Sequence, residues 1–179
     1  EMINFKSLEY LRKGNTRQKL AYQEIQALNI FEDLKLYSPV LTGTIPIGID
    51  LPESDLDIIC QFKDPEDFSA SITDLYQDQP KFQITTADYY GVKSVVANFK
   101  APHFEIEIFG QALPVDQQNA YQHLLIEHAV LALKGPGFKT AVMKLKAAGI
   151  KTEPAFAQLL KLEGDPYLAL LKFGIASSF

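Results

Sequence analysis

The stretch that decides the fold is "GTIPIGIDLPESDLD", residues 43–57. It opens on Gly43-Thr44 and continues through a loop of turn-forming Gly, Pro and Ser residues. It closes on Asp55 and Asp57, which stand one residue apart at the start of an apolar run. Aspartate is disfavoured inside strands, and residues i and i+2 of a strand point to the same face. Two aspartates on one face of a predicted strand therefore indicate a functional site.

A second pair of acids occurs further along the chain, in "HFEIEIFG" (103–110). Glu105 and Glu107 share one face of this predicted strand, and the apolar residues share the other. If the two strands are neighbours, three or four carboxylates converge on one patch of sheet. Like charges at that distance repel, and a hard divalent cation is the usual solution. The alternative is a solvent-exposed strand face, which also alternates polar and apolar residues.

The residues before the aspartates suggest what the cation would serve. Gly43 allows a ligand to approach the backbone closely, and Thr44 offers a hydroxyl and a backbone N–H. A short helix starting there would present its free N–H groups to an anion. One loop would then supply phosphate donors, and the next strand would supply metal ligands. Phosphoryl or nucleotidyl transfer needs this combination of positioning and charge neutralisation.

Composition narrows the class of partner. The 179 residues are 47% hydrophobic and 22% charged, which is typical of a globular domain with a sizeable core, and the net charge is −5. This charge argues against gripping a long nucleic acid, which needs a basic face, but allows a small phosphorylated ligand. The single cysteine, Cys60, excludes an internal disulfide and is expected to be a small buried residue. No apolar run approaches the roughly 20 residues that span a bilayer, so no membrane partner and a cytoplasmic location are expected.

Hydrophobic periodicity and turn signals predict an α+β fold. The expected helices cover about residues 16–34 (capped by Thr16), 64–77, 116–134 (capped by Asp116), 138–149, 152–164 and 165 onward. The expected strands cover 38–42, 55–62, 82–86, 94–99 and 103–109. Residues 1–115 should form a mixed sheet flanked by helices. Residues 116–179 should form a helical region that packs on it as one compact unit.

The quoted loop and its aspartates resemble the signature of the polymerase-beta-like nucleotidyltransferase superfamily. That signature is Gly-Ser, Gly-Gly or Gly-Thr, a spacer and Asp-x-Asp, with a third acid on a later strand. The closest resemblance is to the minimal nucleotidyltransferases, and it covers about residues 16–110. The matching positions are Gly43, Thr44, Gly48, Ser54, Asp55 and Asp57. The helical tail looks like that of an uncharacterised bacterial family in this superfamily.

The resemblance implies a role for each of these positions. Asp55 and Asp57 would bind Mg²⁺ (or Mn²⁺), which bridges the triphosphate of an NTP. The residues Gly43, Thr44, Gly48 and Ser54 would contact the nucleotide. A third catalytic carboxylate would be Glu105 or Glu107. Glu107 is slightly preferred, also as a metal ligand, because it lies closer to the end of its strand.

Two departures from the signature bear on function. Ile45, Pro46 and Ile47 are apolar where minimal members often carry basic residues, and the third acid is Glu in place of the commoner Asp. The expected function is Mg²⁺-dependent transfer of a nucleoside monophosphate from an NTP to a small-molecule or protein acceptor. The alternative is a catalytically weak or inactive nucleotide-binding or partner-binding module of the antitoxin-like kind.

Overall fold

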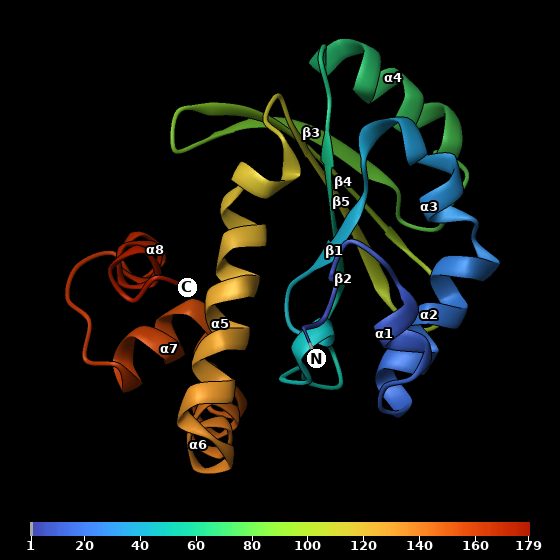
Figure 1. Cartoon of the computed structure of the whole chain (residues 1–179). Helices are drawn as coiled ribbons and strands as arrows, with labels where there is room; N and C mark the ends of the chain where they lie inside the picture. Colours follow the sequence, from blue (N-terminus) through green and yellow to red (C-terminus); the bar gives the residue numbers. More distant parts are fainter. Residues whose placement is uncertain (1) are drawn as a thin grey trace.

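The computed structural model describes residues 2–179, and its centre is one mixed five-stranded sheet with the order β1-β2-β5-β4-β3 (Figure 1). The strands are β1 (Val40–Thr42), β2 (Leu56–Gln61), β3 (Gln83–Tyr89), β4 (Val92–Lys100) and β5 (Glu105–Gln111). Strands β2 and β5 pair in parallel, and the other neighbouring pairs are antiparallel. The two acid-bearing strands are therefore direct neighbours, as the site hypothesis required.

Helices cover both faces of the sheet (Figure 1). On one side lie α1 (Glu9–Arg12), α2 (Thr16–Ala27), α3 (Ile30–Asp33) and α4 (Pro65–Tyr76). On the other lie α5 (Asn119–Lys134), α6 (Pro136–Ala147), α7 (Thr152–Leu159) and α8 (Pro166–Ala176). Short 3₁₀ turns occur at η1 (Lys35–Tyr37), η2 (Ile45–Ile47) and η3 (Val115–Gln117). This arrangement confirms the expected α+β class, with the C-terminal helices packed together.

Strand alternation separates the core from the site. Leu56, Ile58, Ile106 and Ile108 are fully buried in the main core, which they share with residues of α1 to α4. The residues between them point to the opposite face, toward the C-terminal helices. One face of β2 and β5 is therefore packed, and the other carries the acidic side chains.

Helix α4 shows how the sequence directs local structure on the packed face. The side chain of Asp64 accepts hydrogen bonds from the backbone N–H groups of Glu66 (2.7 Å) and Asp67 (3.1 Å), and Pro65 occupies the first helical turn. Such a cap satisfies donors that would otherwise lack partners. Phe68, Ile72 and Tyr76 of this helix are buried against the sheet.

Three expectations about where helices begin and end were wrong. The first long helix does not run to residue 34, because Asn29 adopts a left-handed conformation (φ 57°) and separates α2 from α3. Asn15 caps α2 in place of Thr16, in a reciprocal capping box with Gln18. Asp116 does not cap α5, which begins at Asn119, because Asp116 lies in a 3₁₀ turn and pairs with Lys6 at 2.7 Å.

The loop before β2 connects the two layers of the molecule. Ile45 belongs to the main core, whereas Ile49 is buried in a second cluster formed by α5 to α8, with Ile47 packed against it. The Nζ atom of Lys146 on α6 donates a hydrogen bond of 2.6 Å to the backbone oxygen of Ile49. The apolar residues of this loop therefore have a packing role. Within residues 2–179, no helix is long and apolar enough to cross a membrane.

Candidate active site

Three carboxylates meet where β2 and β5 run side by side. The parallel register places Asp57 opposite Glu107. Asp55 lies two residues before Asp57, just outside the strand. One carboxylate oxygen from each of these residues lies within 4.8 Å of the others. We call Asp55, Asp57 and Glu107 the carboxylate triad.

The sheet also separates the two glutamates that the sequence left as alternatives. Glu107 is partly buried and joins the triad, whereas Glu105 is exposed and lies opposite Lys100 of β4. Glu105 is still close enough to Asp55 to raise the pKa of that carboxyl, after the larger effect of burial. The geometry therefore favours Glu107 as the third ligand for a cation.

The triad carries uncompensated charge. Burial, followed by the charges of Glu107, Asp55 and Glu153, raises the pKa of Asp57 to about 7. Burial and Asp55 also raise the pKa of Glu107. Among the described residues, no basic side chain forms an ion pair with any of the three. Clustered carboxylate oxygens without a counter-ion suit a hard divalent cation, so the residues present fit Mg²⁺ or Mn²⁺.

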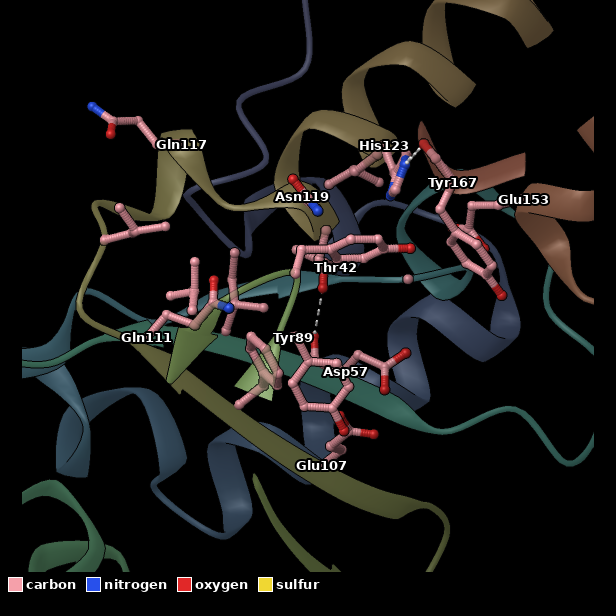
Figure 2. Close-up of a pocket in the computed structure, with 18 of the residues that line it drawn as sticks. Thr42, Asp57, Tyr89, Glu107, Gln111, Gln117, Asn119, His123, Glu153 and Tyr167 are labelled. Carbon is pink, nitrogen blue, oxygen red and sulfur yellow. Dashed lines mark hydrogen bonds between the residues drawn. The ribbon is translucent and has the colours of Figure 1, made fainter. Parts of the chain in front are cut away.

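Asp57 and Glu107 of the triad line a cavity of about 490 Å³ between the sheet and the C-terminal helices (Figure 2). The sheet side contributes Thr42, Asp57, Glu107, Phe109 and Gln111. The helical side contributes residues of α5, α7 and α8, among them Asn119, His123, Glu127, Glu153 and Tyr167. Tyr89 and Tyr90, at the β3–β4 turn, complete the wall. The volume is in the range of small-molecule sites.

Gly43 is the one loop position of the expected nucleotide-binding set that lines this cavity. Its φ of +82° suits glycine, and an added Cβ would lie 2.5 Å from Oδ2 of Asp57. Any larger residue would therefore displace a triad carboxylate.

Thr44, Gly48 and Ser54 do not line the cavity. The hydroxyl of Ser54 accepts a hydrogen bond of 2.8 Å from the backbone N–H of Leu51, which stabilises the turn before β2. Gly48 has a φ of +69° and ends the η2 turn. A nucleotide-binding role for these three residues stays a prediction.

Three further polar or reactive side chains, those of Arg17, His103 and Cys60, are engaged elsewhere. Arg17 pairs with Asp50 at 3.3 Å and lies over the ring of Phe104. His103 contacts the carboxylate of Glu24 through Nδ1 at 3.2 Å. Cys60 is fully buried, as expected. These contacts give each side chain a structural role away from the carboxylate triad.

Sequence reasoning underrated the polar residues of the helical wall. His123 and Glu127, which stand four residues apart on α5, are both buried and line the cavity. The Nε2–H of His123 donates to the backbone oxygen of Tyr167 at 2.9 Å (Figure 2). The signal in the sequence was an acid four residues after a histidine, within a helix rich in leucine. Glu153 gave no such signal, because it reaches the cavity only after α7 has packed against α6 and α8.

The raised pKa of Asp57 predicts a pH-dependent stability of the metal-free protein. Between pH 3.8 and about 7 the folded state retains a proton that the unfolded chain releases, so stability falls as the pH rises. The penalty is on the order of a few kcal/mol, because one pKa unit corresponds to about 1.4 kcal/mol. With a chelator present, Asp57→Asn should therefore melt at a higher temperature than wild type above neutral pH, and at a similar temperature near pH 4.

Thermal unfolding across this pH range measures the difference. Asp74→Asn, on the exposed side of α4, controls for the loss of an acidic surface charge. A constant difference between Asp57→Asn and wild type at all pH values would contradict the prediction.

A comparison with protein families identifies the family of this chain. Residues 23–173 match a family described as a domain of unknown function, DUF4269. The chain belongs to this family. The match spans the sheet, the carboxylate triad and most of the C-terminal helices. No curated protein sequence matches the chain.

Solved structures show the fold of this DUF4269 chain. It superimposes on the Cid1 poly(U) polymerase with Mg and 3′-dATP bound, at a TM-score of 0.54 and 13% identity, covering 78% of this chain and 45% of Cid1. It matches the polymerase core of the RNA surveillance complex TRAMP at 0.53 and 13%, covering 88% and 49%. The GLD-2/RNP-8 complex gives 0.53 and 14%, covering 85% and 60%. The polymerase-beta-like nucleotidyltransferase fold is therefore confirmed, over about half the length of these chains.

Proposed function

We propose that this DUF4269 chain is a Mg²⁺-dependent nucleotidyltransferase, which moves a nucleoside monophosphate from an NTP to a small-molecule or protein acceptor. The observation that carries the proposal is the carboxylate triad, with ligand atoms within 4.8 Å, on the nucleotidyltransferase fold and at the edge of a cavity. Three neighbouring acids at a partly buried site without a counter-ion destabilise the free protein, so a role in holding a cation explains why they are there.

The residues of the site suit one chemical step. An acceptor hydroxyl oxygen attacks the α-phosphorus, the bond from that phosphorus to the bridging oxygen breaks, and pyrophosphate leaves. When bound, Mg²⁺ supplies charge neutralisation for the phosphate oxygens. Asp55, Asp57 and Glu107 would hold it, and one carboxylate of the site would accept the hydroxyl proton. Gly43 lets the backbone approach the ligand without displacing Asp57.

The charge of the site bears on the acceptor. Among the described residues, no Lys or Arg side chain lines the cavity, and the chain carries a net charge of −5. A long nucleic acid would find few cations to neutralise its phosphates. A small molecule or a protein side chain is therefore the better acceptor, although similar structures include an RNA surveillance polymerase.

The same observation supports a second candidate, a nucleotide-binding or partner-binding module of the antitoxin-like kind with little or no turnover. Triphosphates are usually held by basic side chains in addition to the metal. Here the loop after Gly43 carries Ile45, Pro46 and Ile47, of which the first two are buried. The two candidates differ in one result, which is the release of pyrophosphate.

Mg²⁺-dependent thermal stabilisation by NTPs tests the proposal. We expect an NTP at about 100 times its dissociation constant to stabilise the wild type by about 2.7 kcal/mol, since it binds the folded state alone. The double variant Asp55→Ala/Asp57→Ala should lose this response, and a chelator should abolish it in wild type. Stabilisation by no NTP would reject the nucleotidyltransferase. Stabilisation without pyrophosphate release against pools of acceptors would favour the binding module.

A further inference from the structure

The cavity contains more acid than a metal site requires. Four carboxylates line it, namely Asp57, Glu107, Glu127 and Glu153. The first two belong to the carboxylate triad on the sheet. Glu127 and Glu153 come from α5 and α7 on the opposite wall, where Figure 2 shows Glu153 beside Tyr167. We call Glu127 and Glu153 the helical-wall acids.

Glu127 is buried without a partner. Its side chain is only 3% exposed, yet among the described residues it forms no hydrogen bond and no ion pair within 4.0 Å. Its carboxylate oxygens are not completely enclosed by other protein atoms. Glu127 lines the cavity, so a ligand bound there would be next to this unpaired side chain. A buried unpaired carboxyl costs stability, which points to a ligand that pairs with it.

The nearest cation does not balance the helical-wall acids. Lys146 lies close enough to influence Glu127, but its Nζ donates to the backbone oxygen of Ile49, and Lys146 does not line the cavity. It also faces the charges of Glu153, Asp50 and Glu53. Lys146 thus stands among four acids. Of these, Asp50 also pairs with Arg17. A bound triphosphate would make the cavity still more negative.

We infer that the helical-wall acids bind an organic cation, so that the acceptor is a small molecule or side chain carrying a protonated amine near its reacting hydroxyl. Calling this molecule the acceptor rests on the proposed function, whereas the cation subsite itself does not. An ammonium group pairing with Glu127 and Glu153 would satisfy both carboxylates by charge-assisted hydrogen bonds. The hydroxyl end of the same molecule would then lie near the metal ion held by the triad on the facing wall.

A second metal ion fits this wall less well. Among the described residues, the only group of three potential ligands within 4.8 Å is the carboxylate triad. Glu127 and Glu153 therefore lack a third ligand at metal spacing. His123 does not supply it, because among the described residues neither of its ring nitrogens belongs to a group of three ligands at that spacing. An ammonium group needs two or three acceptors and no fixed coordination geometry.

Titration calorimetry with spermidine, in an amine-free buffer without metal or nucleotide, tests the subsite. Wild type should bind spermidine, and triethylene glycol, a neutral chain of similar length, should not bind. The double variant Glu127→Gln/Glu153→Gln should weaken the binding of spermidine by about tenfold or more, as expected for losing hydrogen bonds to charged groups. Glu163→Gln, an exposed acid in the next loop, is the matched control and should bind like wild type.

The comparison with Asp55→Asn/Asp57→Asn locates the amine. A larger loss of affinity in that variant than in Glu127→Gln/Glu153→Gln would place spermidine at the triad and overturn the inference. Failure of the wild type to bind spermidine, or equal binding by the wild type and every variant, would also overturn it. Should the buried change at Glu127 impair folding, Glu153→Gln alone, at a half-buried position, must still weaken binding. Failure of Mg²⁺–NTP stabilisation would reject the proposed transfer and leave this result standing.

Discussion

Replacing Glu107 with Gln is expected to weaken Mg²⁺ binding by about 100-fold or more, because loss of a residue that merely orients a metal ligand already costs 10–100-fold. The amide has the same shape as the carboxylate but no charge. Glu107 is the triad member supplied by β5, directly opposite Asp57. Its removal leaves two aspartates, so Mg²⁺-dependent stabilisation by NTPs should fall below detection.

Glu105→Gln is the matched control, since it removes the same charge from the same strand. Glu105 is exposed and lies outside the triad. We expect this variant to retain most of its Mg²⁺ affinity, measured by calorimetry with Mg²⁺ alone. If Glu105→Gln loses as much affinity as Glu107→Gln, then Glu105 also binds the metal and the geometric choice between them is wrong.

Phe68→Ala is expected to reduce the free energy of unfolding by about 3–5 kcal/mol, through lost burial and the cavity left behind. Phe68 is 1% exposed and packs between the rings of Tyr37 and Phe62. It also covers Gly110 of β5, where an added Cβ would lie 2.5 Å from its ring. The loss is a large part of the 5–15 kcal/mol that stabilises a typical domain.

Urea unfolding at equilibrium measures this change, with Leu75→Ala as control. Leu75 lies on the same helix but is 41% exposed, so its truncation should cost about 1 kcal/mol or less. A similar loss in the two variants would show that α4 does not bury its Phe68 face against the sheet.

Local patterns were sufficient to predict much of this fold. The alternation in "FEIEIF" and the paired aspartates correctly placed two acid-bearing strands, and Asp64-Pro65 correctly predicted the start of α4. These signals depend on neighbouring residues only. The convergence of the strands required the further assumption that they are adjacent. That assumption is correct, since β2 and β5 pair in parallel.

Other features could not be predicted from periodicity and capping patterns. The break at Asn29 follows from a single left-handed residue, which helical periodicity does not reveal. Asp116 has the chemistry of a cap, yet Lys6, more than a hundred residues away, engages it. The proximity of Glu127 and Glu153 could not be predicted either, because it depends on how the C-terminal helices pack together. The register of β2 and β5, which the sequence does not reveal, is what favours Glu107 over Glu105.

The apolar loop between β1 and β2 has a consequence for motion. Ile45 is anchored among the sheet residues, Ile49 is anchored among the helices, and Lys146 holds the backbone between the layers. A hinge that swung the helices away would pull one of these isoleucines into water. We therefore expect the width of the cavity to be nearly constant. Ligands should enter past the exposed tyrosines of the β3–β4 turn. The loop carries apolar residues at the positions where basic residues would bind phosphate, and these apolar residues make it a rigid spacer between the two layers.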